Sequence, residues 1–132
     1  MKKAIAILLL FACLMSFPSC GSGSVKIVDR SSEIYSDEDI EAAMEVVMQA
    51  FDESSELWYL LELSYIGDEW LDSYQDWADR NDADEVIVIL SDFYISYFSD
   101  NPTMNTGSKY EDYNWILVRN EGEEWRIVDR GY

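Results

Sequence analysis

The sequence predicts an α+β domain in which a long N-terminal amphipathic helix packs on a curved sheet of four antiparallel strands, with one short extra helix. Three observations lead to this class: apolar residues at helical spacing early in the chain, a β-branched apolar run near its middle, and two closing strand-like segments. The chain has 132 residues, of which 48% are hydrophobic, and this suffices for the core of one small domain. We expect that domain to cover residues 34–132.

The long helix is predicted to begin after Ser36. This serine can cap a helix, and the acidic residues at 37–39 suit the positive end of the helix dipole. Apolar residues then recur at three- and four-residue spacing, which predicts one buried helix face made of Ile40, Ala43, Met44, Val47 and Phe51.

The remaining elements follow from changes of period. Residues 57–66 turn to a period of two, which is typical of a half-buried strand, and residues 69–80 return to helical spacing. Residues 85–97 contain five consecutive apolar residues, at 86–90, and predict the most buried strand. Residues 115–118 and 125–128 flank a turn-forming segment and predict a closing hairpin, which makes the sheet antiparallel.

The beginning of the chain predicts an export signal. Lys2 and Lys3 precede an apolar stretch over residues 4–17, which is shorter than the roughly 20 residues of a membrane-spanning helix. We therefore expect residues 1–19 to be a signal peptide that is removed together with Cys13.

Residues 14–20 resemble the lipobox of bacterial lipoproteins, in which a small residue precedes the cysteine that is acylated. Phe17 departs from the aliphatic residue that this motif usually has. The resemblance implies a lipid on Cys20 and a domain held on the outer side of the cell membrane, whereas plain secretion after cleavage near residues 19–21 is the alternative. The Gly- and Ser-rich residues 20–33 are then expected to be a flexible tether.

The composition excludes several classes of function. The chain has no histidine, which removes the commonest general base and the commonest zinc ligand. Its 27 acidic against 9 basic residues argue against nucleic-acid binding and against adsorption to anionic lipid. We expect no cofactor, no metal, and contact with the membrane only through the lipid on Cys20.

Nearly all of the expected mature domain resembles small lipoproteins of unknown function from Gram-positive, clostridia-like gut bacteria, whose domain is NTF2-like or cystatin-like. The resemblance lies in three groups of residues: Tyr35, Ser36, Asp39, Ile40 and Ala43; residues 83–88 with Leu90, Ser91 and Phe93; and residues 114–120 with Gly122, Trp125, Arg126, Val128, Asp129, Gly131 and Tyr132. It implies a fold and a location, but no catalytic residues.

Acidic residues offer two candidate sites. Glu62 and Asp92 lie on predicted strands and are candidates for a carboxylate pair acting on a glycosidic bond, although a solvated strand face explains them more simply. Residues 79–85 carry oxygen ligands of the kind that calcium takes, but Ala83 stands where a ligand is needed and the loop has no glycine, so helix termination is the simpler interpretation.

Aromatic residues offer a third candidate, because rings beside carboxylates can stack on sugars or anchor a protein. Helical spacing usually means that such rings face the core, but five Trp and nine Tyr are many for one small core. The residues predicted to bind a ligand are Trp70, Tyr74, Trp77, Tyr110 and Tyr113.

These observations predict a non-enzymatic, lipid-anchored domain that binds an unknown extracellular ligand or protein. Two alternatives stay open: a small carboxylate-dependent hydrolase or isomerase with a cavity in its sheet, and an inhibitor-like lipoprotein that captures cationic proteins through its acidic surface.

Overall fold

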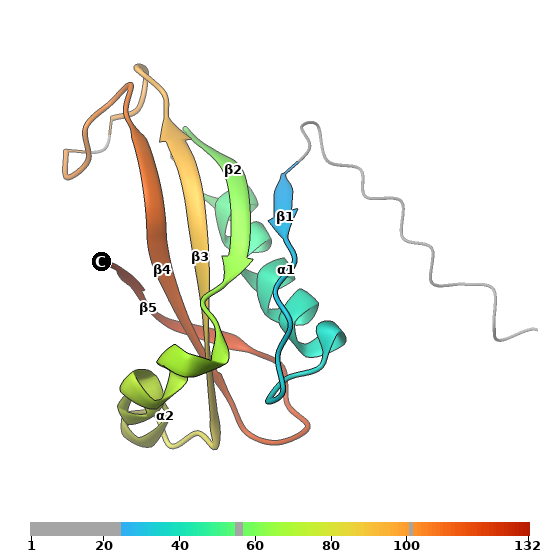
Figure 1. Ribbon diagram of the computed structural model, residues 1–132. Helices are drawn as coiled ribbons and strands as arrows, with labels where there is room; N and C mark the ends of the chain where they lie inside the picture. The colour runs from blue at the N-terminus through green and yellow to red at the C-terminus, as the bar shows by residue number, and fades with distance from the viewer. Residues whose placement is uncertain (1–24, 55–56, 101) are drawn as a thin grey trace, which may run out of the picture.

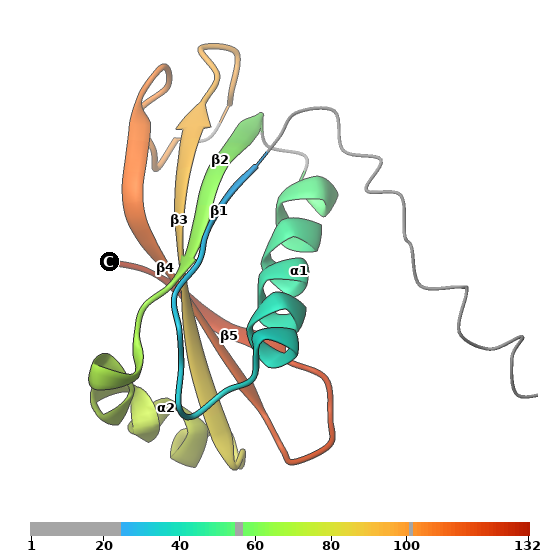
Figure 2. The ribbon, with the colours of Figure 1, turned by 45° about the vertical axis from the view of Figure 1, so that its right-hand side comes forward.

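The computed structural model describes residues 25–54, 57–100 and 102–132 and shows an α+β fold (Figure 1). One five-stranded sheet has the strand order β1-β2-β3-β4-β5. Helix α1 crosses one face of this sheet, and α2 lies at one end of the opposite face (Figure 2). The elements in chain order are β1 (Lys26–Val28), α1 (Asp37–Glu53), β2 (Trp58–Tyr65), the 3-10 helix η1 (Asp68–Tyr74), α2 (Gln75–Arg80), β3 (Glu85–Ile95), β4 (Lys109–Arg119) and β5 (Arg126–Gly131).

The sheet differs from the predicted one in the number and direction of its strands. The prediction of four antiparallel strands behind an N-terminal helix, in the manner of an NTF2-like or cystatin-like domain, is wrong. A fifth strand, β1, precedes α1 and pairs with β2 in parallel, with Lys26 opposite Glu62 and Val28 opposite Ser64. The sheet is therefore mixed, and α1 is the crossover that joins its two parallel strands.

The sequence does not predict strand β1, because its three residues are too few to show the two-residue period of a strand. It also lies within the segment expected to be a tether. The residues that follow it are fixed to the domain. Arg30 donates a hydrogen bond from Nη1 to the carbonyl of Ile66 at 3.0 Å, and the Ser32 hydroxyl donates to the Asp68 carboxylate at 2.6 Å. The described fold thus includes β1 and the residues after it, which the sequence predicts to be part of the tether.

Helix α1 confirms the prediction for its cap and for its buried face. The Ser36 hydroxyl accepts a hydrogen bond from the Asp39 amide at 3.2 Å, and the Asp39 carboxylate accepts one from the Ser36 amide at 3.4 Å, which together form a capping box. The five apolar residues predicted to be buried are the buried residues of α1. At its C-terminal end, the Phe51 ring lies 5.5 Å from the Phe93 ring and 5.2 Å from the Trp115 ring, centroid to centroid.

Strands β2 to β5 form an antiparallel meander, as the sequence predicts. Residues 86–89 of β3 are at most 2% exposed because α1 covers one side of the sheet while η1 and α2 cover the other. The prediction that β3 is the most buried strand is confirmed at this end. The predicted second helix over residues 69–80 is divided into η1 and α2, and Leu71 rather than Trp70 is its buried residue in η1.

Candidate functional site

The helices η1 and α2 cover only one end of the sheet face that lies opposite α1 (Figure 1). Asp92 and Tyr94 of β3 alternate with Phe93, which packs against α1, so these two side chains point to the opposite face. Their cross-strand partners on β2 are Glu62 and Tyr59. No helix of the described residues lies over these four residues, Tyr59, Glu62, Asp92 and Tyr94, which we call the open face.

Two tyrosine rings give the open face its apolar character. The rings of Tyr59 and Tyr94 are stacked with a centroid distance of 6.5 Å and an interplanar angle of 29°. Tyr59 is 55% exposed, and the neighbouring Leu61 is 41% exposed. Such a pair presents flat apolar area to solvent, which is the kind of surface on which sugars and protein side chains stack.

The acidic half of the open face is partly neutralised by lysines at its edges. The Lys26 ammonium lies 3.4 Å from the Glu62 carboxylate, and the Lys109 ammonium lies 3.0 Å from that of Glu111. The hydrogen bond to Glu111 raises the pKa of Lys109, and the charges of Asp92 and Glu62 act in the same direction. Lys109 therefore remains cationic at neutral pH.

Two β-bulges meet beside Asp92 and shape this part of the sheet. In β2, Leu61 is an extra residue between the partners of Phe93 and Asp92. In β4, the pairing shifts opposite the same stretch of β3, and Asp112 has a positive φ of 52°. The Asp92 carboxylate accepts a hydrogen bond at 2.9 Å from the Asp112 amide. Bulges increase the local twist of a sheet, so Asp92 helps to shape the strand ends that extend beyond α2.

The structure brings the two carboxylate candidates together, since Glu62 and Asp92 are directly opposite each other on β2 and β3. Both also have structural partners, because Glu62 pairs with Lys26 and Asp92 holds the bulge at Asp112. A glycosidase needs one carboxyl group in an apolar pocket, whereas this pair lies on the open face of the sheet.

The five aromatic residues predicted to bind a ligand are divided between the two sides of the sheet. On the α1 side, Tyr113 is buried and Tyr110 stacks on Phe93 at 5.5 Å. On the other side, Tyr74 and Trp77 pack against the core, and Trp70 is 54% exposed. They do not form one surface.

The two residues of the stacked ring pair, Tyr59 and Tyr94, are not among those that the sequence predicts to bind a ligand. A signal for Tyr94 was present, since the apolar run of β3 changes after Leu90 to an alternation in which Asp92 and Tyr94 occupy one face. This change marks the point where η1 and α2 no longer cover the strand. Tyr59 becomes identifiable only when the register of β2 on β3 is known.

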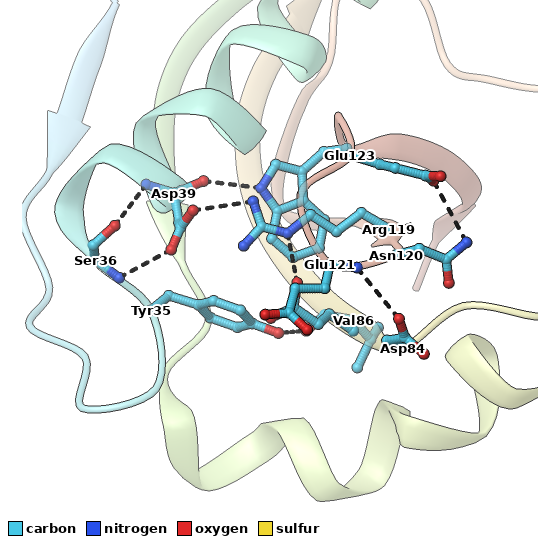
Figure 3. A network of polar contacts seen from close by, with 11 residues as sticks. Tyr35, Ser36, Asp39, Asp84, Val86, Arg119, Asn120, Glu121 and Glu123 are labelled. Atoms are coloured by element: carbon cyan, nitrogen blue, oxygen red, sulfur yellow. Dashed lines mark hydrogen bonds and ion pairs between the residues drawn. The ribbon is translucent and has the colours of Figure 1, made fainter.

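A second polar cluster fixes the start of α1 to the sheet (Figure 3). The Arg119 guanidinium bridges the carboxylates of Asp39, at 3.0 Å, and Glu85, at 2.6 Å, and lies 4.1 Å from the centroid of the Trp125 ring. Trp125 donates from Nε1 to the carbonyl of Asp39 at 3.1 Å. Burial raises the pKa of Tyr35 to about 12, and its hydroxyl donates to the Val86 carbonyl at 2.7 Å. These groups satisfy one another, so we assign them a structural role.

A pocket of about 220 Å³ lies between β1 and α1. Its volume is below the range of roughly 300 Å³ and more that is usual for small-molecule sites. The Arg30 side chain on its rim is bonded to Ile66, and its other charged residues are acidic. We assign it no ligand.

The candidate calcium loop ends helix α2 instead. The Ala83 amide donates to the Ala78 carbonyl at 2.9 Å and the Asp82 amide to the Asp79 carbonyl at 3.4 Å, while Asp82 takes a positive φ of 52°. This is the Schellman pattern of a helix C-terminus and confirms the simpler interpretation of residues 79–85. In the part of the chain that the structure describes, no three His, Cys, Asp or Glu residues are grouped so that they can hold a metal ion.

The predicted signal peptide, Cys20 and the first part of the predicted tether lie outside the described residues. Of the helices that are described, none combines the length and the apolar character needed to cross a membrane. Comparisons of the chain with protein-family models, with curated proteins and with solved structures find no significant match.

Proposed function

We propose that the protein is a lipid-anchored domain on the outer side of the cell membrane that binds an extracellular ligand through its open face and catalyses no reaction. The observation that carries this proposal is the stacked pair of exposed Tyr59 and half-buried Tyr94, next to the opposed carboxylates Glu62 and Asp92. Rings and carboxylates in this arrangement bind by stacking and by charge, and neither mode needs the imidazole that the chain lacks.

The charge around the open face favours a cationic ligand. Four carboxylates stand against two lysines here: Glu62, Asp92, Glu111 and Asp112 against Lys26 and Lys109. The whole chain carries a formal charge of -18, so its long-range field attracts cations and repels anions. Lys or Arg side chains can lie over the tyrosine rings while a carboxylate pairs with their charge. A cell-wall glycan stacked on the same rings is the other ligand class that fits.

The test is a binding titration of the protein with poly-L-lysine and with soluble peptidoglycan fragments, each at low and at high salt. A cationic ligand binds well at low salt and loses affinity as salt rises, while a glycan stacked on the rings responds little. Saturable binding of either probe supports the proposal. Binding of neither probe, at either salt concentration, contradicts it.

A second candidate function, a carboxylate-dependent hydrolase, draws support from the direct opposition of Glu62 and Asp92. A panel of glycosidase and esterase substrates tests it, with Glu62→Gln as the informative variant. Turnover by the wild-type protein that this variant abolishes would replace the binding proposal by an enzymatic one. Glu53→Gln, at the exposed end of α1, is the matched control because it changes the same type of residue away from the open face.

The anchor has its own test, membrane fractionation together with mass spectrometry of the N-terminal peptide. We expect Cys20 to be the first residue of the mature chain and to carry lipid, and we expect Cys20→Ser to release the protein from the membrane fraction. An unmodified terminus would refute lipidation and leave export as plain secretion.

A further inference from the structure

Two exposed aromatic residues occupy the turn that follows β3. Tyr97 is 74% exposed and Phe98 is 85% exposed. Hydrogen bonds hold the backbone here: the Phe98 amide donates to the Ser96 hydroxyl at 3.2 Å, and the Ser96 amide donates to the Leu57 carbonyl at 2.9 Å. We call residues 96–100 the tip. Its two rings are exposed at the end of the sheet, and no part of the described chain covers Phe98.

The opposite side of the same turn supports the tip. Tyr97 lies against Gly107, so closely that a Cβ at residue 107 would overlap the Tyr97 ring. Gly107 has a φ of +74°, and its amide donates to the Ile95 carbonyl at 2.7 Å. The contact with Gly107 and the hydrogen bond to Ile95 therefore fix the position of Tyr97 in the turn.

The charge of this region differs from that of the rest of the chain. Residues 96–108 contain one acidic residue, Asp100, and no Lys or Arg, although the chain as a whole has 27 acidic residues. A turn that is nearly neutral and bears exposed Tyr and Phe is suited to the boundary between water and lipid, where aromatic side chains are enriched.

The chain that follows Cys20 joins the fold at the N-terminal end of β1, and this end points toward the tip. Strand β1 runs parallel to β2, and Lys26 is level with Glu62 and Asp92, which is five residues from Tyr97 and six from Phe98. At about 3.3 Å per residue, this is a distance of about 17–20 Å. Lys26 is six positions after Cys20, and such a segment spans at most about 20 Å. A lipid on Cys20 can thus lie level with the tip.

The other end of the sheet is farther from the anchor. Asp92, which is level with Glu62 and Lys26, is seven residues from Glu85 at the start of β3, or about 23 Å. Helix α2 and the turn between β4 and β5 lie at that end of the sheet (Figure 1). The segment after Cys20 is too short to bring that end level with the lipid.

We propose that the tip docks on the surface of the bilayer that holds the lipid of Cys20, with Phe98 and Tyr97 in the interfacial layer. This inference rests on the proposed anchor and adds a second contact with the membrane. The strands then rise away from the bilayer, and the open face stays accessible at the side of the domain. The acidic surfaces remain in water, which limits their repulsion from anionic lipid.

The test uses the full lipidated chain, purified from membranes and reconstituted into phosphatidylcholine vesicles. In Phe98→Cys the new cysteine is the only free thiol, because Cys13 leaves with the signal peptide and Cys20 carries the lipid, and an environment-sensitive fluorophore is attached to it. Trp70→Cys, labelled in the same way, is the matched control at the other end of the sheet. Both positions are more than half exposed, so neither replacement disturbs the core.

We expect the fluorophore at position 98 to shift its emission to the blue and to be quenched severalfold more by spin-labelled lipids than the one at position 70. Equal quenching at the two positions in lipidated protein would overturn the docking of the tip and leave the anchor proposal intact. A mass spectrum that shows no lipid on Cys20 would overturn the anchor, and this inference with it.

Discussion

Arg119 of β4 and Asp39 of α1 form an ion pair with an Nη1–Oδ1 distance of 3.0 Å, which ties the first turn of the helix to the sheet. The Arg119 side chain is only 15% exposed and also bonds Glu85, so its removal leaves two carboxylates close together without their cation. We expect Arg119→Met to reduce the free energy of unfolding by about 1.5–3 kcal/mol. Urea denaturation measures this loss.

Arg80→Met is the control for that experiment. Arg80 forms an ion pair with Asp76 one helical turn away, but both side chains are more than half exposed. Exposed pairs of this type contribute about 0.2–1 kcal/mol, so Arg80→Met should have the smaller effect. Equal losses in the two variants would show that the bridge made by Arg119 does not hold α1 in place.

The same ion pair predicts a pH dependence. The hydrogen bond from Arg119 holds the pKa of Asp39 below its usual range. The charged carboxylate therefore stabilises the fold above the pKa of the unfolded chain, about 3.9, and this contribution disappears as the pH falls through the lower pKa of the folded state. We expect the stability difference between wild type and Asp39→Asn to be full at neutral pH and to shrink below about pH 4. A difference that is constant across this range would contradict the assignment.

The orientation of α1 is tested by a buried and an exposed position of the helix. Phe51 contacts Phe93 and Trp115, whereas Glu45 lies on the exposed side. Phe51→Ala removes both transfer energy and packing and should cost about 3–5 kcal/mol, while Glu45→Ala should change little. Matching denaturation midpoints for the two variants would contradict the orientation of the helix.

The elements that the sequence predicted correctly are those with a long local pattern. The cap at Ser36 and the spacing from Ile40 to Phe51 determine α1, and the apolar run after Glu85 determines β3. Strand β1 lacks such a pattern, and its pairing partners on β2, residues 62–64, are more than 30 positions away. The parallel strand was therefore beyond a local analysis of the sequence.

The candidate site was predicted less well than the fold. Glu62 and Asp92 were identified separately, and only the register of β2 on β3 shows that they are opposed. Helical spacing suggested that Trp70 and Trp77 share a surface, but the 3-10 geometry of η1 changes that spacing, and only Trp70 is exposed. Exposure of Tyr59 results from where the helices η1 and α2 stop, which no local pattern encodes.

The turn that supports the tip offers a test with a matched control. Gly107 and Gly122 both have a φ near +75°, at +74° and +78°, but a Cβ meets the Tyr97 ring at the first position and open space at the second. The backbone cost of about 1–2 kcal/mol is shared by both replacements with alanine. We expect Gly107→Ala to lose more stability than Gly122→Ala, and the excess to decrease when Tyr97→Ser is added. An equal loss in the two alanine variants would show that Tyr97 does not rest on Gly107.

The central claim is that the open face binds the ligand, and titration with poly-L-lysine tests it most directly. The titration compares the wild-type protein with the double variant Tyr59→Ala and Tyr94→Ala. Trp70→Ala is the control for the loss of an exposed ring. Calorimetry at low salt gives the three dissociation constants, and circular dichroism verifies that all three proteins are folded. If a glycan fragment proves to be the ligand, it replaces poly-L-lysine in the same comparison. We predict that the double variant binds at least about tenfold more weakly, equivalent to about 1.4 kcal/mol, while Trp70→Ala binds like the wild type. Unchanged affinity in the folded double variant would contradict the claim.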